Sequence, residues 1–344
     1  MQLQEIDKVS ITILIDNYTD MLLPNTSNAL RNPMIKEERF LRPPLAEHGF
    51  SALIKIYHKI KKNNKNNKYE TKEYETCSNT FLFDAGVTEE GVTTNAGNFG
   101  VNLEEIGAIV LSHGHFDHFT GIIKVLDHIS KPVDIIAHPD AFLKRWLIFP
   151  DGRRVKMPVL EENALVEKGA IIHKNKIPNF LPLRNSDHKS TKNQEDGFPL
   201  LVTGQIPRET SFEMGSPYQY IEDPDENNLS HDPLVNDDQA IVVNIRDKGL
   251  VIISGCGHAG IINTINYAKK LTGISRIYAI IGGFHLAGGK IYEDAIDPTI
   301  FEIQKADPEW IVPCHCTGWK AVNRIINSMP EKFIQTSVGT VFEF

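Results

Sequence analysis

Hydrophobic and polar positions alternate in short runs along the first third of the chain. Residues 9–16 (VSITILID), 51–58 (SALIKIYH) and 80–84 (TFLFD) are rich in β-branched and aromatic side chains, which predicts three strands. The Lys- and Asn-rich segment near 60–77 offers few side chains that could join a core. We therefore expect an exposed polar insertion between the second and third strands, and its lysines are typical of a solvated loop.

The pattern then changes to apolar runs that lead through polar loops into helices. We expect a strand at 108–111, preceded by a helix that ends at 103–106. A helix at 121–129 and a strand at 133–137 follow. Between 140 and 235 the periodicity is lost and Pro, Asn and Asp are frequent, so this loop-rich segment is expected to hold only loops and short elements.

Regular structure returns in the last third. Two β-rich runs separated by RDKG predict a hairpin of residues 239–245 and 250–253. The other predicted elements are helices at 261–271, 298–306 and 319–329 and strands at 277–281 and 310–313. Strands that end in histidine-bearing loops recur three times, which indicates α/β layering with a site assembled at the strand ends. We expect a single domain over residues 1–344.

Composition narrows the classes of function. With 41% hydrophobic and 23% charged residues, a chain of 344 residues can build a sizeable core. Its net charge of −8 gives no general attraction to phosphate backbones or anionic lipids, which disfavours nucleic acid as a partner. We see no signal peptide, and no apolar stretch approaches the roughly 20 residues of a membrane helix. Four cysteines in so long a chain favour a reducing, cytoplasmic location over a disulfide framework.

The strongest chemical signal is the run SHGHFDH at residues 112–118, directly after a predicted strand. It places four potential ligands within six residues: His113, His115, Asp117 and His118. Histidine and aspartate that are desolvated together need charged partners or a metal, so core packing does not explain them. The sequence therefore predicts that a metal centre begins here.

This run matches the H-x-H-x-D-H motif of the metallo-β-lactamase superfamily, and FLFDAG at 81–86 resembles the superfamily's strand ending in aspartate and glycine. The resemblance implies an α/β fold, the metallo-β-lactamase-like αββα four-layer sandwich, with metals at one edge. It also implies that His113 and His115 bind one metal, and that Asp117 and His118 bind a second and are the catalytic residues. We expect one or two Zn²⁺ ions per chain, although these ligand types also suit Fe²⁺, Mn²⁺ or Mg²⁺.

Three later histidines occupy equivalent places after predicted strands: His258 (SGCGHAG), His285 (GGFHL) and His315 (PCHCTG). We expect His258 and His315 to complete the metal centre, and His285 to be either a ligand or a substrate contact. The superfamily's PGHT-like and G-D-T loops are absent, and SGCGH stands where the bridging aspartate is expected. We therefore expect His258 to replace that carboxylate, and a Cys256→Ser change to leave the metal content unchanged.

Two further cysteines, Cys314 and Cys316, flank His315 at alternate positions. If this segment is extended, both point away from the histidine, which favours buried small residues over ligands.

Six separated motifs resemble one branch of the superfamily: AEHGFS at 46–51, TGQIPR at 203–208, DDQA at 237–240, CGHAGIINT, GGFHL and HCTG. That branch includes an archaeal synthase that joins a dihydropterin to ribofuranosylaminobenzene phosphate in methanopterin biosynthesis. The candidate substrate-binding residues within or near these motifs are His285, Glu47, His48, Arg208 and Lys320. The two basic residues among them would steer an anionic small-molecule substrate.

From these features we expect a metal-dependent hydrolase of a small ester, lactone, thioester or phosphoester, acting through a water molecule whose pKa a metal lowers toward ~7. The branch implies an alternative, a pterin-linked synthase whose metals stabilise a departing diphosphate. A non-catalytic metal or redox sensor is an alternative of another class. A nuclease, as found among relatives of this fold, is disfavoured by the acidic charge balance.

Overall fold

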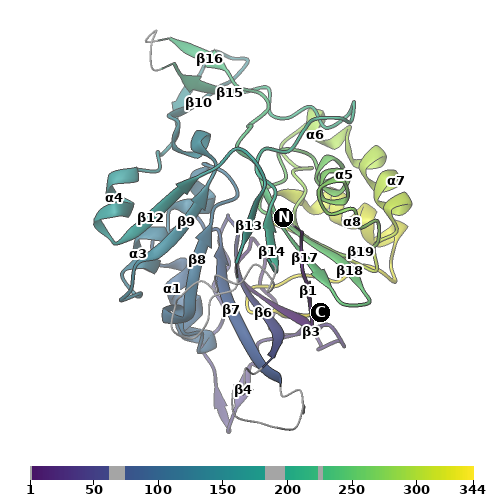
Figure 1. Cartoon of the computed structure of the whole chain (residues 1–344). Coiled ribbons are helices and arrows are strands. Elements are labelled where there is room, and N and C mark those ends of the chain that lie inside the picture. The colour runs from purple at the N-terminus through teal and green to yellow at the C-terminus, as the bar shows by residue number, and fades with distance from the viewer. Residues whose placement is uncertain (1, 62–73, 183–197, 224–227) are drawn as a thin grey trace.

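The computed structural model describes residues 2–61, 74–182, 198–223 and 228–344. In these residues two β-sheets are stacked face to face and helices cover both outer faces (Figure 1). The longer helices are α1 (Gly91–Phe99), α5 (Ile261–Thr272), α7 (Ile296–Ala306) and α8 (Trp319–Ser328), and the shorter ones are α2 (Phe116–Phe119), α3 (Ile122–Leu126), α4 (Glu162–Glu167) and α6 (Lys290–Glu293). The implied four-layer αββα sandwich is confirmed. Within the described residues, no helix is both long enough and apolar enough to cross a bilayer.

The first sheet has eight strands within the described residues. In spatial order they are β12 (Ala170–Lys174), β9 (Val133–Ala137), β8 (Ile106–Val110), β7 (Tyr74–Phe83), β6 (Ser51–Lys61), β2 (Lys8–Ile15), β21 (Val341–Glu343) and β3 (Ala29–Leu30). The second sheet consists of β13 (Asn179–Leu181), β14 (Leu200–Val202), β17 (Ala240–Ile245), β18 (Gly249–Ser254), β19 (Ile277–Gly283) and β20 (Trp310–Cys314), with β1 (Glu5–Ile6) paired to β17. The antiparallel pairing of β17 with β18 confirms the predicted hairpin.

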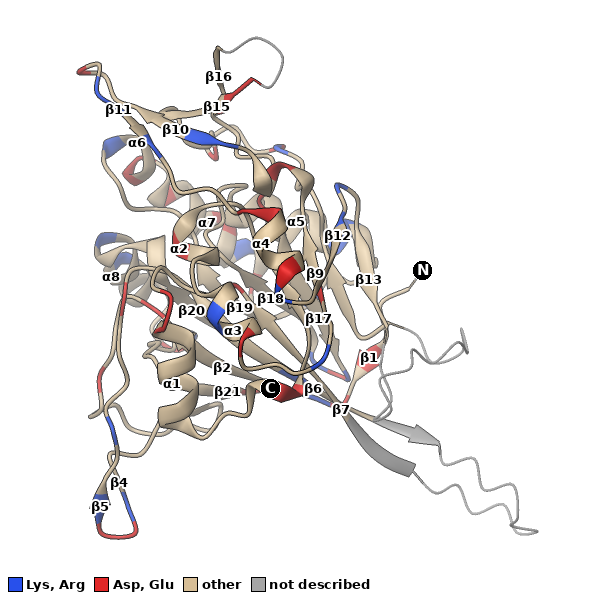
Figure 2. Ribbon diagram, turned by 90° about the vertical axis from the view of Figure 1, so that its left-hand side faces the viewer, with Lys and Arg blue, Asp and Glu red and all other residues tan. Residues whose placement is uncertain are grey.

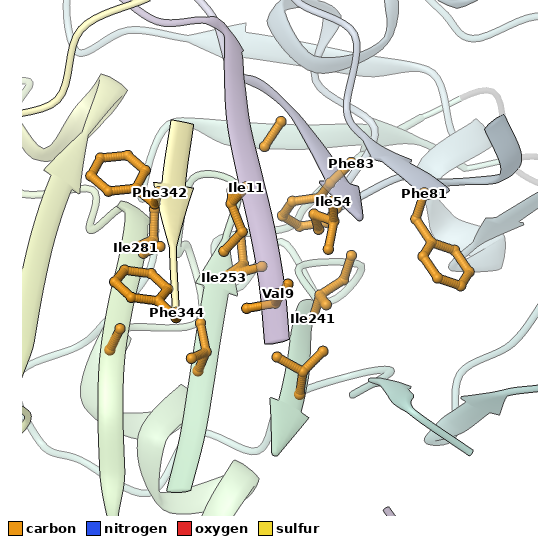
Figure 3. Packing of buried hydrophobic residues seen from close by; sticks show 14 of the residues in the cluster. Val9, Ile11, Ile54, Phe81, Phe83, Ile241, Ile253, Ile281, Phe342 and Phe344 are labelled. Carbon is orange, nitrogen blue, oxygen red and sulfur yellow. The ribbon is translucent and has the colours of Figure 1, made fainter. Parts of the chain in front are cut away.

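Three apolar clusters hold the four layers together. On β18, Val251 and Ile253 point into the cluster between the sheets, whereas Leu250 and Ile252 pack beneath α5 and α7. This alternation follows from the two-residue period of a strand, and continuous apolar runs are expected where both faces of a strand are buried. The inter-sheet cluster includes residues from both ends of the chain, such as Val9 and Phe342 (Figure 3). The third cluster packs the first sheet against α1 and α3.

Parallel pairing places the loops that carry chemistry at one edge of the sandwich. Strands β7, β8 and β9 run parallel in the first sheet, and β18, β19 and β20 run parallel in the second. Parallel neighbours need crossover connections, which α5 and α7 provide in the second sheet. The loops after β7, β8, β18, β19 and β20 contain Asp84, residues 112–118, residues 256–258, His285 and His315.

The segment 140–235 is more regular than its sequence suggests. It contains a separate four-stranded sheet, ordered β11 (Arg154–Lys156), β10 (Arg145–Ile148), β15 (Gln219–Glu222) and β16 (Leu229–His231), as well as α4 and three strands of the two main sheets. This small sheet projects from one end of the molecule, above α6 in Figure 2. Its strands have only three or four residues, too few to produce a recognisable alternation.

Two other differences from the sequence expectations have local causes. The helix expected to end at 103–106 ends at Phe99, because Gly100 adopts a left-handed conformation with φ 68° and the Asn102 side chain caps a separate 3-10 turn, Leu103–Glu105. The short hairpin formed by β4 (Ile35–Lys36) and β5 (Arg39–Phe40) was not predicted from the sequence. Of the polar insertion near 60–77, residues 62–73 lie outside the described residues, and β6 and β7 pair up to Lys61 and Tyr74 on either side of them.

Candidate metal centre

The loop after β8 is held in a tight path by contacts to Gly114, which lies between the first two histidines of the motif. The Gly114 amide N–H donates to Asp237 Oδ2 at 2.7 Å. A β-carbon on Gly114 would lie 2.1 Å from the carbonyl oxygen of Ala141, so only glycine fits. The backbone therefore passes close to Ala141 and leaves the His113 and His115 side chains on the inner side of the loop, where both are buried.

His113, His115 and His258 form a first group of converging side chains. His115 Nδ1 lies 2.9 Å from His113 Nε2 and 3.1 Å from His258 Nε2, and all three residues are buried. Burial lowers the pKa of His115 to about 3, with the Arg145 charge adding to the effect, and burial also holds the pKa of His113 and of His258 well below the usual value. The ring nitrogens of these three neutral imidazoles converge on one point, and a single N–H there cannot form hydrogen bonds with all of them at once. A cation at this point can bind all three nitrogens.

Asp117, His118 and His315 form a second group beside the first. Asp117 Oδ2 lies 3.3 Å from His315 Nε2 and 3.8 Å from His118 Nε2. Burial acts to raise the pKa of Asp117, but the neighbouring His118 and His315 outweigh it and hold this carboxyl ionised. Although His315 Nε2 is buried, it makes no hydrogen bond within the described residues. An anionic oxygen and two imidazole nitrogens at this spacing match the ligand chemistry of a divalent metal.

His118 is oriented by a buried carboxylate that the sequence expectations did not assign. Asp84, at the end of β7, places Oδ2 2.7 Å from His118 Nδ1 and accepts a 2.6 Å hydrogen bond from Ser112 Oγ. Burial lowers the pKa of His118, but the Asp117 and Asp84 charges outweigh it and raise this pKa to about 9. Binding of His118 Nδ1 to Asp84 leaves Nε2 facing the cluster, as in the carboxylate–histidine pairs that surround protein metals.

His315 is fixed in the same way by the end of β2. Its amide N–H donates to Asp16 Oδ1 at 2.8 Å, and its Nδ1 lies 3.0 Å from Asn17 Oδ1. These contacts direct the remaining ring nitrogen, Nε2, toward Asp117. The two residues were not singled out in the sequence, because nothing local to residues 16 and 17 reveals a partner almost 300 positions away.

Cys256 is shared by both groups. Its Sγ lies 3.2 Å from His118 Nε2 and within 4.8 Å of the ligand atoms of the first group, His113 and His258, as well as of Asp117, His118 and His315 in the second. A β-carbon on Gly255 would lie 2.2 Å from Ser112 Oγ, and Gly257 has φ 72°, so the two glycines allow this close path. His258 lies at the cluster as part of the first group, whereas Cys256 lies near the ligand atoms of both groups; whether His258 replaces the bridging carboxylate stays a prediction.

Cys316 also lies at the cluster, contrary to the expectation for an extended segment. His315 has φ 46° and begins a 3-10 turn, His315–Thr317, so its neighbours do not alternate as in a strand. Ligand atoms of Cys316, His285 and Cys256 lie within 4.8 Å of one another, and Cys316 Sγ donates to the Cys256 carbonyl at 3.1 Å. Cys314 is buried, as expected.

Of the candidate substrate-binding residues, His285 and His48 lie at the cluster. The His285 ring centroid is 4.1 Å from that of His258. His48 Nε2 is 3.5 Å from Asp117 Oδ2 and its side chain is 64% exposed, which places it at the open side of the second group.

The other three candidates have partners elsewhere. The Glu47 carboxylate accepts hydrogen bonds from the backbone of Val87 and Thr88. The Arg208 guanidinium donates to the Leu234 and Val235 carbonyls. Lys320 forms an exposed ion pair with Glu293. Within the described residues, none of these three side chains forms a hydrogen bond or ion pair with the histidine cluster, although the Arg208 charge helps to lower the pKa of His258.

Comparisons with known proteins agree with this fold. Residues 74–270 match the metallo-β-lactamase superfamily model. The chain is 33% identical over 300 residues to the uncharacterised protein MJ0448 of Methanocaldococcus jannaschii, covering 86% of this chain and 93% of that protein. The chain therefore belongs to the metallo-β-lactamase superfamily, whose members bind divalent metals.

Two further relatives are informative. The chain is 26% identical over 312 residues to the 7,8-dihydropterin-6-methyl-4-(β-D-ribofuranosyl)-aminobenzene-5′-phosphate synthase of the same organism, covering 88% of this chain and 92% of the synthase. The crystal structure of Tm1679, described as a metal-dependent hydrolase of the β-lactamase superfamily, aligns with a TM-score of 0.64 at 20% identity over 98% of both chains. At that identity, the structural likeness shows the fold alone.

Proposed function

We propose that this protein is a metal-dependent hydrolase of a small molecule, with a binuclear centre at the edge of the sandwich. The first metal would be held by His113, His115 and His258, and the second by Asp117, His118 and His315. The single observation that carries the proposal is the convergence of these six side chains, from three strand-end loops, into two adjoining groups. The buried His315 Nε2, which makes no hydrogen bond within the described chain, supports a cation as the partner of the second group.

Zinc fits this donor set best. Imidazole nitrogen and thiolate sulfur are favoured zinc ligands, and Cys256 offers a sulfur to both groups. When bound, a divalent metal lowers the pKa of a water molecule toward ~7 and polarises the carbonyl or phosphoryl group of a substrate. With Cys256 in the shared position, the protein supplies a soft sulfur where an aspartate is expected in relatives.

The protein's own residues supply orientation and proton acceptors. Asp117 stays ionised beside His118 and His315, so its carboxylate accepts a hydrogen bond from the attacking water and orients it. Asp84 holds His118 in one ring orientation through Nδ1. His48, at the open side next to Asp117, is placed to contact a substrate as it enters. A small ester, lactone, thioester or phosphoester is the substrate class that this arrangement would hydrolyse.

A direct test combines metal analysis with turnover. The purified protein should contain one or two zinc ions per chain and hydrolyse at least one member of a panel of small esters, lactones, thioesters and phosphoesters. Chelation should remove turnover, and added zinc should restore it. Turnover that is unchanged after complete removal of metal would contradict the proposal.

A second candidate is a pterin-linked synthase, favoured by the 26% identity to the archaeal synthase over most of both chains. The same two groups would then stabilise a departing diphosphate while the ring of the second substrate attacks. Incubation with a dihydropterin diphosphate and ribofuranosylaminobenzene phosphate distinguishes the two functions. Release of diphosphate that depends on both substrates identifies the synthase, whereas hydrolysis of the panel without such release identifies the hydrolase.

A further inference from the structure

The loops after β18 and β20 bring two cysteines together at the edge of the candidate metal centre, although β19 lies between these strands in the sheet. Cys316 Sγ donates to the Cys256 carbonyl at 3.1 Å, and the two sulfur atoms lie within 4.8 Å of each other. The strand between them ends at Gly283, where an added β-carbon would lie 2.7 Å from Cys316 Sγ and 3.1 Å from Cys256 Cα. A glycine at this position therefore leaves the space in which the two cysteines meet.

The side chains of these cysteines face each other. Both thiols are free in the structure, and they interact through a side-chain hydrogen bond. A disulfide bond is about 2.05 Å long and forms between cysteines whose side chains point toward one another. Because the two sulfur atoms are already in contact, rotation of the side chains is the main movement that such a bond requires.

Solvent reaches the two cysteines unequally. Cys316 is half-buried, whereas Cys256 is 3% exposed. Cys314, the other free cysteine of the described residues, is buried, and its Sγ donates to the Val312 carbonyl. An accessible thiol with a second thiol beside it is the arrangement in which a first oxidation product is captured as a disulfide. An oxidant therefore meets Cys316 first, and Cys256 is in place to react with the product.

We propose that Cys256 and Cys316 form a reversible intramolecular disulfide when the protein meets a hydroperoxide, and that this bond withdraws the Cys256 sulfur from the metal centre. The disulfide goes beyond the proposed function, in which Cys316 has no part. Its effect on metal binding rests on the proposed function, because that effect requires the metals to be held where Cys256 Sγ lies, 3.2 Å from His118 Nε2.

The reaction balances with hydrogen peroxide as the only co-reactant. The Cys316 sulfur attacks one peroxide oxygen, so that an S–O bond forms, the O–O bond breaks and the other oxygen leaves as water with the thiol proton. The Cys256 sulfur then attacks the Cys316 sulfur, so that the S–S bond forms, the S–O bond breaks and a second water leaves with the Cys256 proton. Two electrons pass from the two sulfur atoms to the peroxide. A dithiol reductant reverses the reaction by thiol–disulfide exchange.

The disulfide would change the metal centre through one atom. The thiolate is the form of cysteine that binds metals, and a disulfide sulfur carries no such charge. Cys256 Sγ lies within 4.8 Å of ligand atoms of both groups, so the disulfide removes a candidate donor from both at once. Oxidation should therefore weaken metal binding, and reduction should restore it. In a compartment that keeps thiols reduced, a disulfide of this kind is transient and responds to oxidant.

Treatment of the zinc-loaded protein with hydrogen peroxide tests the proposal directly. Peptide mapping by mass spectrometry without reductant should show the peptides that contain Cys256 and Cys316 joined and lighter by two hydrogen atoms, and dithiothreitol should separate them. A colorimetric zinc indicator should report metal release over the same period. Oxidation of Cys316 to a sulfinic or sulfonic acid without the cross-link, or two thiols that stay unreacted, overturns the proposal.

Two variants assign the metal release to this bond. Cys316→Ser lacks the thiol that reacts first, so it should retain its zinc through the same treatment. Cys314→Ser is the matched control and should lose zinc as the unmutated protein does. The zinc content of each variant before treatment is its own baseline. Release of zinc from Cys316→Ser at the rate of the unmutated protein would show that the oxidant acts on another group, and would overturn the link between the disulfide and the metals.

Turnover is measured separately. Cross-linking in a protein that has no metal-dependent turnover contradicts the proposed function and supports the disulfide. Metal-dependent turnover in a protein whose two thiols never join overturns the disulfide alone.

Discussion

The Asp237 carboxylate accepts the backbone N–H of Gly114 at 2.7 Å and so fixes the loop between the first two histidines of the candidate metal centre. Its other oxygen accepts a 2.5 Å hydrogen bond from Arg145, whose second arm donates to Asp232 at 2.6 Å. Burial opposes ionisation of Asp237, but the Arg145 charge outweighs it and keeps the pKa of this carboxyl low. The small sheet that carries Arg145 on β10 is therefore connected directly to the candidate site.

Replacing Arg145 should be strongly destabilising. Arg145→Ala leaves the buried Asp237 without its counter-charge, and removing one partner of a buried pair costs about 3–5 kcal/mol in the free energy of unfolding. Arg153→Ala is the matched control, because Arg153 pairs with Asp151 at the surface and its loss should cost less than about 1 kcal/mol. Urea denaturation measures the free energy of unfolding of both variants. An equal loss in the two would show that the buried ion pairs of Arg145 contribute little.

Replacing Gly114 should damage the metal centre through the backbone alone. The added methyl group of Gly114→Ala would overlap the Ala141 carbonyl, so the loop must move and metal affinity should fall. Gly97→Ala is the control in α1, where an added β-carbon meets no atom within 4 Å, and it should raise the free energy of unfolding by about 0.4–1 kcal/mol. Metal titration and thermal unfolding of the two variants check this, and unchanged metal affinity in Gly114→Ala contradicts it.

Removing a candidate ligand should abolish activity without unfolding the protein. We expect His115→Ala and Asp117→Ala each to lose turnover, because both side chains lie at a strand-end edge supported by three independent apolar clusters. His128→Ala removes an exposed histidine whose Nδ1 contacts the Lys124 carbonyl and not the candidate ligands, and it should leave turnover intact. Circular dichroism monitors folding. Turnover at wild-type metal content in either ligand variant contradicts the assigned centre.

Replacing Cys256 tests which side chain occupies the position between the two ligand groups. The sequence led us to expect no effect of replacing this cysteine, but its position in both groups now predicts that Cys256→Ser lowers the metal content, as His258→Ala should. Cys314→Ser is the control, because Cys314 is equally buried but its Sγ donates to the Val312 carbonyl. The metal content of each variant is measured after dialysis. Full metal content in Cys256→Ser together with loss in His258→Ala would support the expectation from the sequence.

The sequence predicted the sandwich well where elements are long and buried. Strands such as β9 and β18 and helices such as α5 were located within one or two residues, because β-branched runs and amphipathic periods are local signals. The four-stranded sheet in 140–235 was missed because its strands are too short to show a period.

The candidate site was predictable to a similar degree. The six expected ligand residues are brought together by the structure, because their sequence positions after strands correspond to one edge of parallel sheets. The roles of Asp84, Asp237 and Asp16 depend on contacts between distant segments. The geometry of Cys256 and Cys316 depends on backbone turns at glycines and at His315 that have no unique sequence signal.

The hydrogen bond from the His315 amide to Asp16 also fixes an order of assembly. The two residues are 299 positions apart, so the contact closes only after residue 315 has left the ribosome. The last residue of the first group along the chain is His258. The second group is complete only after β20 and the turn that follows it have been synthesised. During synthesis, which proceeds from the N-terminus and lets early segments fold first, a nascent chain can therefore bring three imidazoles together before the Asp117 carboxylate acquires His315 as its last neighbour. Metal loading in the cell is expected to be stepwise.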